Sequence, residues 1–282
     1  MESVYLNGGM IGATLDFADT DKYILDTSTI FTAPTYLGGA SGIASNGGAI
    51  SLNLTSLSLQ QDDILIVMTA AADSGSEPNI LSTDVTQIDS YLFGDDTEDI
   101  TMEFGYLIVG ASPPSSISSR ASGDTDNSTV HIIQAFRGVD LTAFSARLFA
   151  ANGYNTNVGS DTANPTFTSV SIQTNNSIVV SLAASSNDLS SGSYSAPEMT
   201  DFITVGANDT YDAVGGMGYT LIETSGGTFT ASSWTSADDD TAKAYASAQI
   251  VLPAKETTTF TYGNQKNSGI WNLQAVLESL EV

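Results

Sequence analysis

Apolar and polar residues alternate along most of the chain, and a period of two residues predicts β-strands. Residues 50–59, ISLNLTSLSL, alternate in this way, whereas residues 64–72, ILIVMTAAA, form a continuous apolar run that predicts a strand buried on both faces. Many short strands with almost no helical periodicity predict an all-β fold, an antiparallel β-sandwich or jelly-roll-like arrangement. Turn-forming residues bound the further predicted strands: 86–93, 100–109, 129–136, 147–151, 167–173, 177–184, 202–205, 217–223, 228–234 and 244–252.

The strand pattern occurs twice. Residues 54–72 align with residues 167–185 at a shift of 113 positions, with identities that include Val67 with Val180 and Ala70 with Ala183. The same shift places residues 94–109 on 207–222, and a shift of 115 aligns 130–136 with 245–251. Two separated blocks in one register predict an internally duplicated chain with two β halves. Spacing alone leaves open whether each half is its own sandwich or both share one.

Four regions follow from this pattern. They are an N-terminal segment of assembly-arm or edge strands (1–46), a first β half (47–140), a second β half (141–254) and a C-terminal tail (255–282). The stretch between the halves is not a Pro- or Ser-rich linker, which favours tight packing between them. Residues 36–48, YLGGASGIASNGG, match neither a P-loop nor a dinucleotide fingerprint and are interpreted as a flexible loop.

The tail predicts a short amphipathic helix. Its apolar positions fall on one helical face, and Ser268 could cap the start. A helix of about a dozen residues is not stable alone in water, so we expect it to dock on its own domain or on a neighbouring subunit. The predicted assembly anchors on this segment are Ile270, Trp271, Leu273 and Leu277.

Charge and cysteine content exclude several classes of function. The chain of 282 residues has 7 Lys and Arg against 32 Asp and Glu, a formal net charge of −25 that repels a phosphate backbone. We therefore expect neither nucleic-acid binding nor attraction to anionic membranes. There is no Cys for a disulfide or a thiolate nucleophile. No apolar run approaches the roughly 20 residues of a membrane span, so no membrane insertion is expected.

No motif predicts a catalytic residue or a cofactor site. The single His, His131, lies in the strand-like TVHIIQAF and is interpreted as a half-exposed structural residue. No G-x-S-x-G elbow is present. Carboxylates cluster at 95–99, 124–126 and 238–240, but EF-hand spacing is absent, so calcium is an alternative to solvated acidic loops and no metal site is predicted.

Aromatic residues of the second half have two interpretations. They could form a platform on which a sugar stacks, or they could belong to the core, as most aromatics of a sandwich do. The core interpretation is preferred for the set concerned: Tyr194, Phe202, Tyr211, Tyr219 and Trp234.

The order of motifs resembles a β-rich virion module of tailed bacteriophages, often from aquatic phages. The motifs are SLNLTSLSLQQDDILIVMTAA, GYLIVGASPPSS, IIQAFRGVD, TNNSIVVSLAA and AYASAQIVL, and together they span residues 50–252. The ends are also similar, because GIWNL looks like the G-x-W-x-L endings of phage structural proteins. The FRGVD-like strand and the ordered succession carry the resemblance.

The resemblance implies a non-enzymatic virion protein on the particle exterior, with other virion proteins and copies of itself as partners. A long fibre shaft would need heptads or extended repeats, which this chain lacks. A compact head or tail appendage, or a fibre-associated module, fits better. Two alternatives stay open, a capsid decoration protein and a carbohydrate-binding adhesin module that contacts a host-surface glycan.

Overall fold

The structure is a computed structural model that describes residues 5–6, 9–10, 23–72, 79–93, 99–122, 128–148, 153–159, 164–187, 193–206, 212–236, 244–264 and 270–272. The chain divides into two compact units. The sandwich unit is Phe31–Lys255, and the terminal unit combines Met1–Ile30 with Glu256–Val282. Each unit is described by itself.

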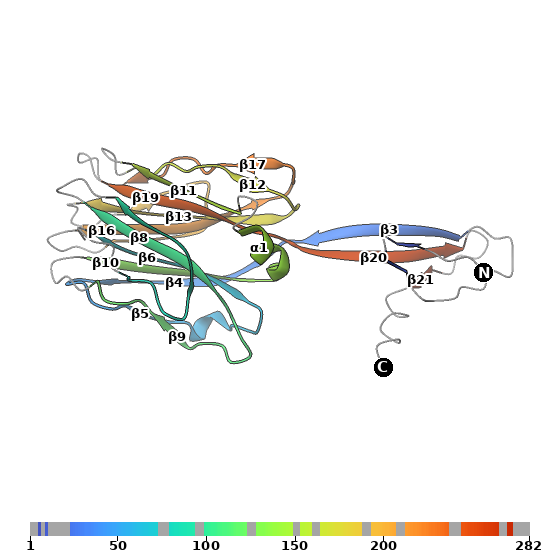
Figure 1. Cartoon of the computed structure of the whole chain (residues 1–282), viewed down its shortest axis with the longest axis horizontal. Helices are drawn as coiled ribbons and strands as arrows, with labels where there is room; N and C mark the ends of the chain where they lie inside the picture. The colour runs from blue at the N-terminus through green and yellow to red at the C-terminus, as the bar shows by residue number, and fades with distance from the viewer. Residues whose placement is uncertain are drawn as a thin grey trace. The chain divides into compact units, whose positions relative to one another are not determined.

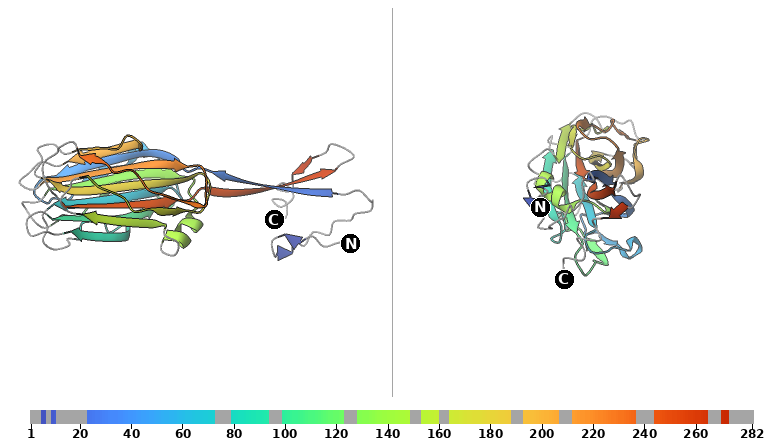
Figure 2. Two further views of the ribbon diagram at one scale, coloured as in Figure 1. Left: turned by 90° about the horizontal axis from the view of Figure 1, so that it is seen from above. Right: turned by 90° about the vertical axis from the view of Figure 1, so that its right-hand side faces the viewer.

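The sandwich unit contains two five-stranded antiparallel sheets that lie face to face (Figures 1 and 2). The first sheet has the order β4 (Thr35–Ala44), β10 (Thr129–Arg137), β6 (Ile64–Ala72), β8 (Ile100–Ile108), β7 (Thr86–Phe93). The second has the order β11 (Tyr154–Gly159), β19 (Tyr245–Leu252), β13 (Ser177–Asn187), β16 (Asp212–Ile222), β15 (Thr200–Gly206). An all-β sandwich is therefore confirmed.

Apolar side chains fill three layers of this unit. The largest cluster lies between the two sheets and takes Ile66 and Met68 from β6 and Val180 and Leu182 from β13. Smaller clusters lie on the outer face of each sheet. The central strands are thus buried on both faces, which explains their continuous apolar sequences. The outer layers are made by β5 (Ser51–Asn53) with β9 (Ser116–Ser118), the 3₁₀ turn η1 (Thr55–Leu57), β12 (Val170–Ile172) with β17 (Gly227–Phe229), and β14 (Tyr194–Ser195) with β18 (Thr235–Ser236).

The two sheets correspond strand by strand. Pairing of β6 with β8 joins Ile64 to Ile108, and pairing of β13 with β16 joins Ile178 to Leu221. Ile64 and Ile178 both point into the central cluster. Across the interface β4 packs on β15 and β7 packs on β11, so the sheets meet as two copies do in a two-fold symmetric dimer. A duplication would produce this correspondence.

The register of the repeat differs from the sequence alignment. A shift of 113 places Val67 on Val180, but Val67 lies on the outer face of the first sheet and Val180 lies in the central cluster. A shift of 114 places Ile64 on Ile178 and keeps the facing of every residue of β6 and β13. The alignment of this block at a shift of 113 is therefore wrong by one residue, because a slip of one position in a strand exchanges its two faces. The duplication itself stays a prediction.

The glycine-rich segment is a strand. Residues 36–44 belong to β4, so the flexible-loop prediction is wrong there. A Cβ at Gly42 would lie 2.7 Å from Cγ2 of Ile50, and a Cβ at Gly39 would lie 2.7 Å from the carbonyl oxygen of Ile133. Glycine is needed here because Ile50 and the adjacent strand β10 approach the backbone of β4 closely.

A helix was missed. Residues Leu141–Leu148 form α1, so the predicted strand at 147–151 is wrong for its first two residues. Asp140 caps the helix, because its Oδ1 accepts a hydrogen bond of 2.8 Å from the backbone N–H of Ala143. Phe144 and Leu148 are buried and attach the helix to the core.

The terminal unit is built from both terminal regions of the sequence. Its strands are β1 (Tyr5–Leu6), β2 (Gly9–Met10), β3 (Tyr23–Thr32), β20 (Lys255–Asn264) and β21 (Ile270–Asn272). The last two residues of β3 and the first residue of β20 belong to the sandwich unit. β20 lies between β3 and β21, and Tyr262 pairs with Trp271.

Candidate functional site

Two of the four predicted anchors lie in a strand. Ile270 and Trp271 belong to β21, so the prediction of a helix that includes them is wrong. Pairing with Thr261–Gly263 of β20 gives hydrogen-bond partners to the backbone of this segment. In the first turn of a helix, by contrast, the backbone N–H groups have no partner within the helix. Leu273 and Leu277 lie outside the described residues. The anchoring role of all four residues stays a prediction.

His131 is fully buried, so the half-exposed interpretation is wrong in that detail. Its Nδ1 lies 2.6 Å from Oγ1 of Thr69, the residue that pairs with it on β6. Burial lowers the pKa of His131 from 6.5 to about 4, while a backbone hydrogen bond with Met68 acts in the opposite direction. The imidazole is therefore neutral at pH 7.

A buried carboxylate lies in the same row of the first sheet. Glu103 of β8 pairs with Thr69, so His131, Thr69 and Glu103 follow one another across three strands. The Glu103 Oε2 accepts hydrogen bonds from the backbone N–H groups of Ile80 (2.9 Å) and Leu81 (2.6 Å). All three side chains are buried, and the carboxylate holds the covering loop in place.

The aromatic residues of the second half are mostly core. Trp234 and Tyr194 are buried and pack with Phe167 and Phe202. They are not available for stacking on a sugar, which supports the core interpretation for these residues. Tyr211 lies outside the described residues.

Tyr219 differs from this group. It is half-buried, and its ring packs against the half-buried Tyr36 of β4 with 5.3 Å between the ring centroids and a tilt of 38°. Its hydroxyl donates a hydrogen bond of 3.0 Å to Oδ2 of the exposed Asp201. Burial, followed by this hydrogen bond, raises the pKa of Tyr219 to about 12. Asp201 has a positive φ of 46°, an unusual conformation for a residue with a side chain.

The acidic clusters give no metal site in the described ranges. Within those ranges no group of three or more His, Cys, Asp and Glu side chains is placed to hold a metal ion. Asp99 is half-buried at the start of β8, while residues 94–98, 124–126 and 238–240 lie outside the described ranges. Calcium binding by those clusters stays an open alternative.

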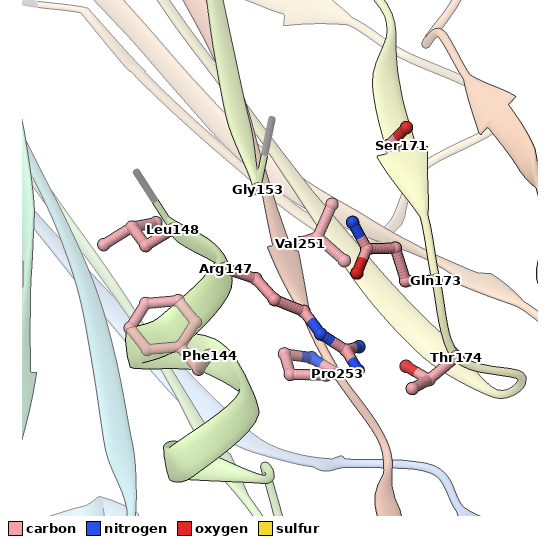
Figure 3. A pocket seen from close by; sticks show the side chains of 9 residues that line it. All are labelled: Phe144, Arg147, Leu148, Gly153, Ser171, Gln173, Thr174, Val251 and Pro253. Carbon is pink, nitrogen blue, oxygen red and sulfur yellow. The ribbon is translucent and has the colours of Figure 1, made fainter. Parts of the chain in front are cut away.

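A small hollow lies beside α1, with room for about one water molecule. Figure 3 shows the side chains around it. The half-buried Arg147 reaches from the last turn of α1 toward Thr174 and Pro253. The lining residues are Phe144, Arg147, Leu148, Gly153, Ser171, Gln173, Thr174, Val251 and Pro253.

The local sequence explains how Arg147 reaches the hollow. Leu141, Phe144 and Leu148 are spaced as one face of a helix, and burial of Phe144 and Leu148 turns Arg147 to the side of the hollow. A Cβ at Gly153 would lie 2.8 Å from the carbonyl oxygen of Arg147, so only glycine fits there. The Asp140 cap together with this spacing is the signal from which the helix and its arginine could have been found.

The sandwich unit also holds a bidentate ion pair. Nε and Nη2 of Arg137 each lie 2.8 Å from a carboxylate oxygen of the buried Asp63. The backbone N–H of Gln60 donates to the same carboxylate (2.7 Å). Among the described residues this is the only salt bridge. Arg137 is the arginine of the FRGVD segment. The sequence pattern did not predict its ion pair with Asp63.

Comparisons of the chain with family models, with curated proteins and with solved structures found no match. In the described part of the chain, no helix is long and apolar enough to span a bilayer.

Proposed function

We propose that the chain is a non-enzymatic structural component of a tailed-phage virion, a compact head or tail appendage that assembles on the particle exterior. One observation carries this proposal beyond the sequence resemblance. The two predicted assembly segments contribute to one terminal unit, separate from a sandwich unit that has its own filled core. Such a division suits a protein that attaches through one unit and presents the other.

The packing of the sandwich unit supports this assignment of roles. The outer face of each main sheet packs against small β layers, so much of the apolar surface of these faces is already buried within the unit. The terminal unit carries the predicted anchors Ile270 and Trp271 on β21. We propose that these apolar residues contact a neighbouring virion protein or another copy of the chain. A capsid decoration protein is one form of the same proposal.

Truncation after Gly269 tests the attachment role. The shortened chain is expected to fold, because the core of the sandwich unit ends before Lys255, and to be lost from purified particles. Leu221→Ser is the matched control, since Leu221 is an exposed apolar residue (44%) of the sandwich unit. Normal incorporation of the truncated chain would refute the anchoring role. Loss of the Leu221→Ser variant as well would show that incorporation does not depend on the terminal unit in particular.

A carbohydrate-binding adhesin is the second candidate, and the contact between Tyr36, Tyr219 and Asp201 favours it. Half-exposed tyrosine rings with a carboxylate beside them suit the apolar face and the hydroxyls of a sugar. A glycan array with the wild type and Tyr36→Ala tests this candidate. Binding that Tyr36→Ala removes would support it, and an array without specific binding would exclude it.

A further inference from the structure

The first main sheet ends in a strand with an open edge. β4 pairs with β10 on one side, and no other strand in the described ranges pairs with it. Apart from a bulge near its start, its residues 38–44 follow β10 without a register shift. A regular edge of this kind presents backbone N–H and C=O groups to which a further strand can bond.

Two of the other three edges of the main sheets are interrupted in the middle. β7 has a bulge between Gln87 and Asp89. β15 has one between Thr200 and Ile203, where Asp201 takes a positive φ of 46°. A bulge twists an edge strand and breaks the regular ladder that a partner strand would need. These two edges are therefore protected against pairing with another molecule.

The remaining edge, β11, is covered by residues 166–169. This strand occupies the place in the second sheet that β4 occupies in the first. The Thr168 Oγ1 donates a hydrogen bond of 3.0 Å to the carbonyl oxygen of Thr156, and the Asn155 Nδ2 donates one of 3.1 Å to that of Ser169. Within the described part of the chain, no side chain forms such a bond to the backbone of β4. The first half has thus left open the edge that the second half covers.

The open edge is also uncharged. No Lys, Arg, Asp or Glu occurs between Asp26 and Asp62, although the formal net charge of the chain is −25. β4 lies within this stretch, together with β5 and η1. Copies of an acidic protein repel one another, and this repulsion is weakest where two uncharged surfaces meet. A basic partner protein would instead be attracted to the acidic remainder of the surface.

The second part of β4 is the accessible part. Ile203 of β15 approaches the strand at Gly39. Beyond that point Ser41 is exposed, and Ile43 is 48% exposed, one of few large apolar side chains in the described ranges with so much contact with solvent. An exposed apolar residue on a regular, uncharged edge strand is a feature of a surface that pairs with another strand.

We propose that two copies of this chain associate through the β4 edge, by antiparallel pairing of residues 40–44 about a two-fold axis. An open edge binds an extended strand, and a second copy provides one that is uncharged and of the same length. Small side chains at Ala40, Ser41 and Gly42 let the two strands approach, and each Ile43 gains cover from the other copy. This inference concerns the sandwich unit and does not depend on the proposed virion role.

Sedimentation equilibrium of the full chain over a range of concentrations tests the proposal. The mass is expected to rise with concentration toward that of a dimer. Ser41→Asp places two carboxylates close to the two-fold axis and should weaken the association about tenfold or more. Ser51→Asp is the matched control, because it adds the same charge at an exposed position of β5 and should leave the association unchanged. Added salt should strengthen the association, since it screens the repulsion between the acidic copies.

A spin label locates the interface without adding a charge. The chain has no Cys, so Ser41→Cys and Ser51→Cys each carry a single label per copy. Dipolar broadening of the electron paramagnetic resonance spectrum is expected for the label at position 41 and not for the label at position 51, and it should disappear on dilution.

Three results would overturn the proposal. The first is a chain that stays monomeric up to its highest soluble concentration. The second is an association that survives Ser41→Asp and gives no broadening at position 41, which would place the contact on another surface. The third is an equal loss of association in Ser41→Asp and Ser51→Asp, which would show an effect of net charge and not of the β4 edge.

Discussion

The buried histidine makes the stability of the sandwich unit depend on pH. His131 has a folded-state pKa of about 4, lowered from 6.5 by burial. As the pH falls below 6.5, the unfolded chain binds a proton that the folded chain does not bind. The free energy of unfolding therefore falls until the pH reaches about 4. At about 1.4 kcal/mol per pKa unit, the loss between pH 7 and pH 4.5 is about 2.5 kcal/mol.

Urea unfolding of the wild type and of His131→Asn, followed by circular dichroism between pH 7 and pH 4.5, measures this loss. Carboxylates also titrate in this range, but their contribution is common to both proteins and cancels in the difference. The free energy of unfolding of the wild type should fall relative to His131→Asn by about 2.5 kcal/mol. His131 is the only histidine, so no other imidazole contributes.

Thr69→Val is the matched control for this measurement. It removes the hydrogen bond to His131 but keeps the volume and the burial of the pair, and burial is the main cause of the lowered pKa. This variant should therefore keep the wild-type pH dependence. A difference between wild type and His131→Asn that stays constant across the range would refute the reasoning.

Three further changes have expected outcomes in the same unfolding assay. Asp63→Asn should lower the free energy of unfolding by about 1–3 kcal/mol, because the bidentate contact with Arg137 is lost while the 38% exposure of that arginine limits the penalty; an unchanged urea midpoint would contradict this. Gly39→Ala should destabilise by about 1–3 kcal/mol through contact with Ile133 and Ile203, whereas Gly110→Ala, with nothing within 4 Å, should stay close to wild type; equal effects would contradict the close packing of β4. Trp234→Ala should cost about 3–5 kcal/mol, since this residue is buried among three aromatic rings; a small effect would show that the cluster is not packed as described.

Strands with clear boundaries were predictable from the sequence. The predicted strand at 86–93 matches β7, and those at 100–109 and 129–136 match β8 and β10 to within one residue. Each combines β-branched or aromatic residues with turn formers at both ends. β4 was not predicted as a strand because its glycine-rich sequence is typical of a loop. The glycines fit close neighbours such as Ile133 and Ile203, which the sequence alone does not place beside β4.

The register of the repeat was not predictable because β6 and β13 are apolar on both faces. ILIVMTAAA has no alternation of apolar and polar residues that distinguishes the inner from the outer face. Identities such as Ala70 with Ala183 therefore favoured a shift of 113, one residue less than the shift that matches the faces. The hollow was missed for a related reason. Arg147 was assigned to a strand, and its neighbours Thr174 and Pro253 approach it only through tertiary packing.

The proposed virion role is tested most directly on the assembled particle. Virus particles are purified through a density gradient from cultures that produce this chain, and their proteins are quantified by mass spectrometry. An antibody against the sandwich unit is used to label the particles in the electron microscope. The proposal predicts a fixed number of copies per particle and labelling at one place on the exterior. Particles that lack the chain, while the lysate contains it in soluble form, would contradict the proposal.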